Sequence, residues 1–214
     1  MKTILALTAL VAAPAFAQIE GDVHFTVESG KITIGLIAED ESSTVPGLRV
    51  FFGELGLDIP NVGTDPGWLA LDGTFAASTP LSFDFLGSLK RWNGSSFSAA
   101  AETMTLAFGP ANATTPAADS FAPGFALNTD DEGGLHDHPS FTLNAPASDG
   151  IYLLPLQFSA PGLTASDPVW MLWGQNASES DIAAAYDYSL ANIPAPTTLA
   201  LAAIGVAATT RRRR

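Results

Sequence analysis

Two of the three histidines in this chain stand two residues apart, at His136 and His138, in the stretch DDEGGLHDHPSF. Side chains alternate between the two faces of an extended segment, so we expect both imidazoles to point the same way and Asp137 the other way. Their Cα atoms would lie about 7 Å apart, which allows both rings to bind one ion. Zinc, copper and nickel accept imidazole ligands, and zinc commonly takes three protein ligands and a water.

The remaining histidine, His24, is the candidate for a third ligand. It lies in GDVHFTV, where apolar and polar residues alternate as in a strand. Each histidine has an acid close by, Asp22 near the first and Asp137 between the other two, and such carboxylates can orient imidazoles. The sequence therefore predicts a zinc site made by His24, His136 and His138, with Asp22 and Asp137 as supporting residues. Histidines that merely face solvent beside a turn are the alternative.

Calcium is a second metal to consider for the same stretch. Asn128, Asp130 and Glu132 precede Gly133 in a spacing similar to that of an EF-hand loop. However, the twelfth position of such a loop is Pro139, where a bidentate glutamate is required. The sequence therefore favours zinc over calcium.

Sequence motifs for catalysis are missing. The chain has no nucleophile elbow, zinc-protease helix or phosphate loop, and no cysteine. We predict a protein that is not an enzyme; a metal-dependent hydrolase is the alternative, because an open zinc position can activate water. A metal-free structural or carbohydrate-binding role is a further alternative, in which tryptophans stack on sugar rings: Trp68, Trp92, Trp170 and Trp173.

The elements that must position these residues are predicted to be strands. DVHFTVESGKITIGLIA alternates on both sides of Ser29-Gly30, which indicates a hairpin, and WNGSSF contains the turn pair Asn93-Gly94. About nine short strands separated by Gly and Pro clusters predict an all-β fold. We expect one antiparallel β-sandwich, immunoglobulin-like or jelly-roll-like, over residues 18–190.

One segment, SESDIAAAYDYSLAN, favours a short helix. Ser180 or Asp181 is the expected N-cap, and Ile182, Ala185 and Leu190 fall loosely on one side. A last strand that runs into the linker is the alternative.

Both ends of the chain have the composition of export signals. Residues 1–17 combine Lys2, a short apolar run and a small-x-small site, which predicts a signal peptide removed by signal peptidase before Gln18. Residues 191–214 contain Pro194-Ala195-Pro196, then 14 residues of low polarity, then Arg211, Arg212, Arg213 and Arg214. This apolar run is too short to be a permanent membrane anchor, so we expect only transient membrane contact.

The order of short motif, hydrophobic segment and arginine cluster resembles the PEP-CTERM sorting signal of exported bacterial proteins. The usual glutamate of the Pro-Glu-Pro motif is Ala195 here. The resemblance implies sorting by exosortase, a membrane protease, to the cell envelope, cell surface or extracellular matrix, where exopolysaccharide is a candidate partner.

The processed chain is strongly acidic. Residues 18–196 contain four basic side chains, Lys31, Arg49, Lys90 and Arg91, and all 22 acids, which gives a formal charge of −18. Such a surface repels phosphate backbones and attracts divalent cations. We therefore predict no nucleic-acid partner.

Three further blocks resemble a group of PEP-CTERM surface proteins with zinc-responsive, Zur-controlled expression: WNGSSF, GGLHDHPSFTLN and DGIYLLPLQFSAPGLTASDPVWMLWGQN. They are also similar to surface-anchored domains found beside metal transport systems. This resemblance implies export, a β fold and a connection with zinc supply, and it includes His24, His136 and His138.

Overall fold

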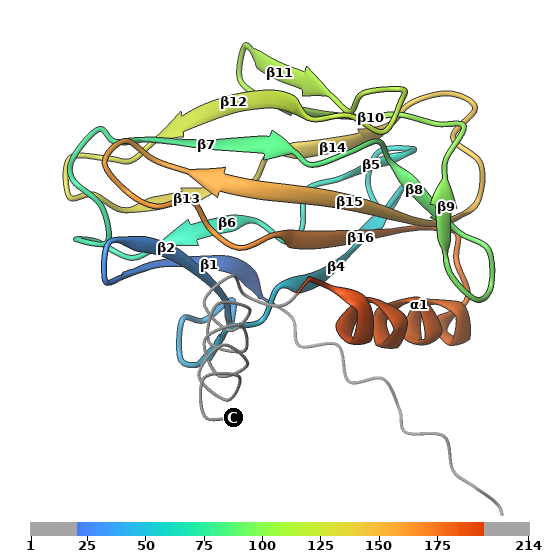
Figure 1. Cartoon of the computed structure of the whole chain (residues 1–214), viewed down its shortest axis with the longest axis horizontal. Coiled ribbons are helices and arrows are strands. Elements are labelled where there is room, and N and C mark those ends of the chain that lie inside the picture. Colours follow the sequence, from blue (N-terminus) through green and yellow to red (C-terminus); the bar gives the residue numbers. More distant parts are fainter. Residues whose placement is uncertain (1–20, 195–214) are drawn as a thin grey trace, which may run out of the picture.

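The computed structural model describes residues 21–194 as strands with one helix near the end, which confirms the all-β prediction (Figure 1). The helix is α1, Glu179–Asn192. The strands are β1 (Asp22–Glu28), β2 (Lys31–Ile37), β3 (Thr44–Pro46), β4 (Val50–Leu55), β5 (Val62–Gly63), β6 (Trp68–Ala70), β7 (Pro80–Phe85), β8 (Lys90–Trp92), β9 (Phe97–Ala99), β10 (Met104–Phe108), β11 (Ala111–Thr114), β12 (Ala122–Asn128), β13 (Leu135–Asp137), β14 (Ser140–Leu143), β15 (Gly150–Ser159) and β16 (Val169–Gln175).

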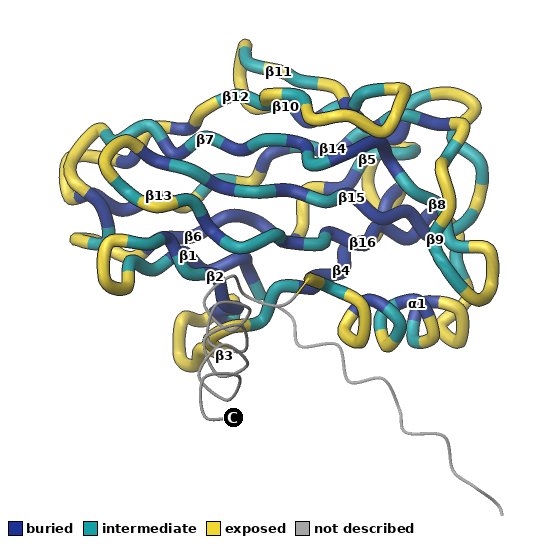
Figure 2. Tube along the Cα trace, in the orientation of Figure 1, coloured by how far each residue is buried: buried dark blue, intermediate teal, exposed yellow. Residues whose placement is uncertain are grey.

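Three sheets form the described part of the chain. The largest has the order β12-β7-β15-β16-β4, with β8 paired to β15 and β9 paired to β8. A five-stranded sheet has the order β13-β6-β1-β2-β3, and a four-stranded sheet has the order β11-β10-β14-β5. Buried side chains from all three sheets meet in one core, so the arrangement is sandwich-like, and Figure 2 shows exposed residues concentrated in the loops between strands.

Two strand pairs are parallel, which corrects the expectation of purely antiparallel sheets. β1 pairs with β6 and β4 pairs with β16, whereas the other pairs between named strands are antiparallel. Parallel partners must be joined by a long excursion of the chain. The alternation within one strand carries no information about such a distant partner, so the sequence could not reveal these pairs.

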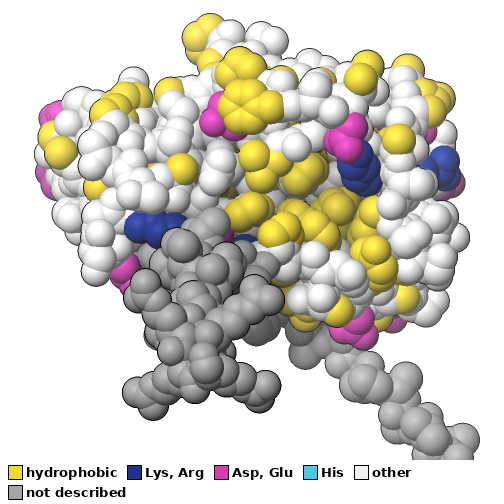
Figure 3. Space-filling view, in the orientation of Figure 1, with side chains coloured by type: hydrophobic (Ala, Val, Ile, Leu, Met, Phe, Trp, Pro, Cys, Tyr) yellow, Lys and Arg dark blue, Asp and Glu magenta, His cyan; other side chains and the backbone are white. Residues whose placement is uncertain are grey.

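The large sheet is buried on both faces. On β15, Tyr152 and Leu154 contribute to the main core, whereas Ile151 and Leu153 belong to a second apolar cluster with Ile182 of α1. This explains why β15 and β16 read as nearly continuous apolar runs rather than as simple alternation. Figure 3 shows further apolar side chains gathered at the surface, near the middle of the side of the molecule seen in Figure 1.

The predicted helix is confirmed, with two corrections. Its N-cap is Ser178, whose hydroxyl accepts the Asp181 N–H at 3.2 Å, rather than Ser180 or Asp181. Ser189 is buried, whereas Leu190 is 47% exposed. Ala185 and Ser189 follow Ile182 by three and seven residues, so they lie on the same side of the helix and are buried with it. Leu190 is one residue further along and points away from that side.

The local hairpins show how far turn residues determine register. Ser29 and Gly30 have positive φ and join β1 to β2 with Glu28 opposite Lys31, as the sequence predicts. Between β8 and β9 the predicted two-residue turn is wrong. A four-residue loop, residues 93–96, lies there instead, because the Asn93 side-chain oxygen accepts the backbone N–H groups of both Ser95 and Ser96.

Truncation of Ile182 to alanine should lower the free energy of unfolding by about 2–4 kcal/mol, because it leaves a cavity between α1 and the large sheet. Chemical denaturation measures the change. Leu190→Ala is the matched control on the same helix, and it should cost less than about 0.5 kcal/mol. Equal losses in the two variants would contradict this placement of α1.

Candidate metal centre

Asp22 is the donor that the fold fixes most firmly. On β1, Val23 and Phe25 face the core with no exposed surface, so Asp22 and His24 point to the outer side of the five-stranded sheet. The Asp22 side chain is only 9% exposed. Its Oδ1 accepts the Gly67 N–H at 2.7 Å, which leaves Oδ2 directed at His136.

His136 and His138 reach the same place from β13 and from the residue just after it. His136 lies opposite Leu69 of β6, and the two Nε2 atoms of the histidine pair are 3.3 Å apart. This confirms the prediction that both imidazoles point the same way. Asp137 lies opposite Trp68, whose side chain is in the core, so it faces the other way as predicted.

Three donor atoms converge at this position. His136 Nε2 lies 3.1 Å from Asp22 Oδ2 and 3.3 Å from His138 Nε2, and all three atoms are within 4.8 Å of one another. Tetrahedral zinc with bonds of about 2.0–2.1 Å requires donors about 3.3–3.4 Å apart. Two of the three donor–donor distances, 3.1 and 3.3 Å, are therefore close to those that zinc needs. The ligand set is two imidazoles and one carboxylate.

Neutral imidazoles alone cannot pair these three atoms with one another. If His136 Nε2 carries the proton, Asp22 Oδ2 and His138 Nε2 must share that single N–H. If His138 Nε2 carries it instead, the lone pair of His136 Nε2 faces the Asp22 carboxylate across 3.1 Å. A cation placed among the three atoms would accept a lone pair from each of them.

Asp65 is a residue of this site that the sequence reasoning missed. Its Oδ1 lies 2.9 Å from His138 Nδ1, on the side of the ring away from His136. A carboxylate at one ring nitrogen fixes the imidazole orientation and raises the basicity of the other nitrogen. The sequence signal available was the turn Thr64-Asp65-Pro66-Gly67 before β6, but its partner lies more than 70 residues away.

Gly67 leaves the space that His138 occupies. The register places Gly67 between Asp22 and His138, and its N–H binds the Asp22 carboxylate. A Cβ at this position would lie 2.6 Å from Cε1 and 2.7 Å from Nδ1 of His138. The imidazole therefore lies directly against the Gly67 backbone.

His24 does not belong to the cluster of three donors. It points to the same outer side as His136, but Leu69 of β6 lies between them, so their Cα atoms are about 10 Å apart across two strand spacings. His24 is buried, and burial lowers the pKa of its imidazole. Asp22, predicted as a supporting residue, takes the place that the sequence assigned to His24.

Asp137 remains close without a direct contact. Burial raises the pKa of its carboxyl, partly opposed by the nearby charges of His136 and His138. Among residues 21–194, no hydrogen bond links it to either imidazole. Its effect on the site is therefore electrostatic.

The acidic turn before β13 is organised by Asp130 and is not an EF-hand loop. The Asp130 side chain accepts the N–H groups of Glu132 and Gly134, at 3.0 and 2.8 Å. One of its oxygens is thus used to close the turn. The turn directs the chain from β12 into β13, which carries His136.

The comparison with protein families matches residues 192–214 to the PEP-CTERM protein-sorting motif. This tail is a PEP-CTERM sorting signal. The motif marks exported, cell-surface proteins and implies recognition by exosortase during export, so the predicted localisation is confirmed. The comparisons with curated proteins and with solved structures found no match.

The PEP-CTERM signal begins at the end of α1. The match starts at Asn192, the last residue of the helix, and the domain boundary predicted after residue 190 lies in the last helical turn. Pro194 is the last described residue; Ala195, Pro196, Arg211–Arg214 and the predicted signal peptide lie outside the described residues. Within residues 21–194 there is no helix with the length and apolar character needed to span a membrane.

Replacing Gly67 by alanine should displace the His138 imidazole, because the new methyl group would overlap the ring. A crystal structure, or the NMR shifts of the His138 ring, would measure the displacement. The double variant Gly67→Ala/His138→Ala removes the overlap, so it should be at least as stable as His138→Ala alone. An unmoved ring in Gly67→Ala would contradict this packing.

Proposed function

We propose that this exported surface protein binds zinc at Asp22, His136 and His138 and serves zinc homeostasis outside the cell, without catalysing a reaction. The observation that carries the proposal is the convergence of the three donor atoms, with edges of 3.1 and 3.3 Å. The protein's membership of the zinc-responsive group stays a prediction, because the family match covers the sorting tail alone.

The ligand set supports zinc rather than calcium or magnesium. Those two ions take oxygen ligands, whereas two of the three donors here are imidazole nitrogens. Copper and ferrous iron also accept two histidines and a carboxylate, so a metal panel is needed to rank them. The charge of −18 on the processed chain would raise the local concentration of any divalent cation.

The exposure of the donors supports reversible binding. The side chains of His136 and His138 are 51% and 40% exposed, so solvent can supply the fourth ligand and other chelators can compete for the ion. Structural zinc sites, in contrast, are usually closed by four protein ligands. A site of this kind is suited to the capture and release of zinc, and the same open position is what a hydrolase would need.

The carbohydrate-binding alternative that depends on tryptophan stacking loses two of its four candidates. Trp68 and Trp173 are 1% and 0% exposed, because both lie in the main core. Trp92 and Trp170 are half-buried beside α1. This burial favours the metal-binding proposal.

Substitution of any one donor should weaken zinc binding by at least about tenfold, since it removes one of three ligands. The variants are Asp22→Asn, His136→Ala and His138→Ala, and the measurement is competition against a chromophoric chelator, repeated with copper and ferrous iron. Asp65→Asn should have a smaller effect in the same direction, because it only releases the His138 ring.

Two controls separate this site from its alternatives. Asp131→Asn removes one exposed acid from the nearby turn and should leave zinc affinity unchanged. His24→Gln distinguishes the observed cluster from the site of three histidines predicted from the sequence. A strong loss in His24→Gln together with no loss in Asp22→Asn would overturn the assignment of donors.

Sorting should depend on the motif just after α1. Pro194→Ala/Pro196→Ala should leave the tail uncleaved, so that mass spectrometry of the envelope fraction finds the tail still attached to the protein. Thr209→Ser/Thr210→Ser changes the same tail but keeps the motif and the arginines, and it should be processed normally. Equal processing of both variants would show that exosortase does not read these prolines.

A further inference from the structure

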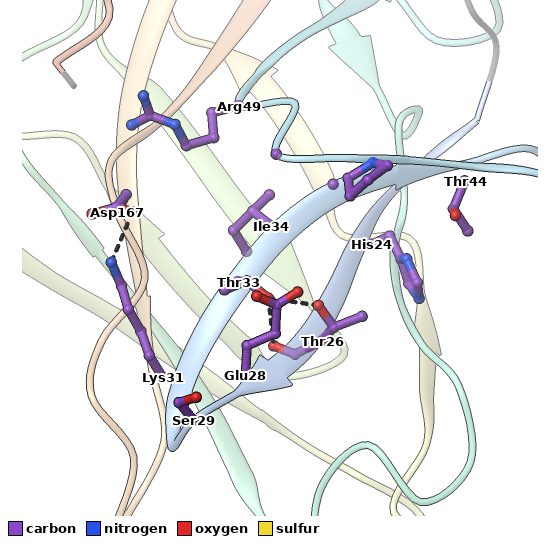
Figure 4. Close-up of a pocket in the computed structure, with 13 residues that line it drawn as sticks. His24, Thr26, Glu28, Ser29, Lys31, Thr33, Ile34, Thr44, Arg49 and Asp167 are labelled. Carbon is purple, nitrogen blue, oxygen red and sulfur yellow. Dashed lines mark hydrogen bonds and ion pairs between the residues drawn. The ribbon is translucent and has the colours of Figure 1, made fainter. Parts of the chain in front are cut away.

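A second candidate site lies on the outer side of the five-stranded sheet, away from the three metal donors. It is a pocket of about 630 Å³ over β1, β2 and β3 (Figure 4). Figure 4 shows Lys31, Asp167 and Arg49 along one side of it and His24 and Thr44 on the other. Its volume is within the range of pockets that hold small molecules.

His24 lines this pocket with a buried atom that has no partner. The residue is 8% exposed, and its Nε2 makes no hydrogen bond. Buried polar groups in folded proteins are nearly always paired with protein or with a bound molecule. The wall of the pocket therefore contains a polar side chain whose hydrogen-bonding capacity is unused.

Basic side chains make up a larger share of the charged residues in this pocket than in the processed chain as a whole, although two acids, Glu28 and Asp167, line it as well. Two of the four basic residues in the processed chain, Lys31 and Arg49, line it. Lys31 Nζ lies 2.8 Å from the Asp167 carboxylate, and one nitrogen of Arg49 donates to the Pro168 carbonyl at 3.2 Å. A guanidinium has five N–H donors, so Arg49 keeps donors for an anionic group.

Hydroxyl groups form part of the wall between the charged side and His24. Thr26 and Thr33 lie opposite each other on β1 and β2, with their oxygens 2.6 Å apart. Each hydroxyl has a proton and two lone pairs, so the pair retains unused hydrogen-bonding capacity. Such groups match the hydroxyls of a polyol.

We propose that this pocket binds a small carboxylic acid that also carries hydroxyl groups, of the sugar-acid class. The carboxylate would bind Arg49, and hydroxyls would bind the Thr26 and Thr33 pair next to His24. The site goes beyond the proposed zinc function, because none of its donors belongs to the metal cluster.

The test is an NMR titration of the purified exported protein with D-glucuronate, in the presence of a metal chelator. D-Glucose lacks the carboxylate and acetate lacks the hydroxyls, so both should bind at least about tenfold more weakly than D-glucuronate. Backbone shifts should move in β1 and β2, around Thr26 and Thr33.

Arg49→Gln should weaken glucuronate binding about tenfold or more. Arg91→Gln is the matched control, because Arg91 is on β8 in the large sheet and does not line the pocket. Thr33→Val tests the hydroxyl wall with a side chain of similar shape, should the Arg49 variant fail to fold. His136→Ala should leave glucuronate binding unchanged, which separates this site from the zinc site.

Three results would overturn the proposal: no saturable glucuronate binding, equal affinity for glucose, or equal affinity in Arg49→Gln and Arg91→Gln. Loss of binding in His136→Ala would assign the ligand to the metal cluster instead. None of these results depends on whether zinc binds.

Discussion

The pairing of β1 with β6, and of β6 with β13, is the constraint on which the candidate metal centre depends. This register places Gly67 between Asp22 and His138, and Leu69 between His24 and His136. Because Gly67 has no side chain, Asp22 and His138 approach each other over it. The Leu69 side chain, in contrast, keeps His24 and His136 apart. Two residues of β6 and its preceding turn thus decide which of the candidate donors meet.

The same register positions Asp22 before any ion arrives. Trp68, between Gly67 and Leu69, is held in the core by edge-to-face contacts with Phe83 and Phe158, with ring centroids 5.3 and 5.1 Å away. A hydrogen bond to an ionised carboxylate, such as that from Gly67 to Asp22, contributes about 1.5–3 kcal/mol. Donors positioned in advance lose little entropy on binding, which favours affinity.

Features that depend on neighbouring residues could be predicted from the sequence, whereas features that depend on strand partners far along the chain could not. The alternation on β1 and the His-x-His spacing correctly predicted which side chains share a face. The choice of Asp22 over His24, and the part played by Asp65, depend on a parallel pair between strands 45 residues apart. No local pattern of residue types contains that information.

The helix shows the same division between local and distant causes. Its existence follows from local composition, but the face it buries is decided by the apolar outer side of β15 and β16. Because α1 packs on the large sheet and the metal donors stand on the outer side of the five-stranded sheet, the main core lies between them. Helix α1 and the candidate zinc site therefore belong to different layers, so an ion can bind or leave without disturbing this helix.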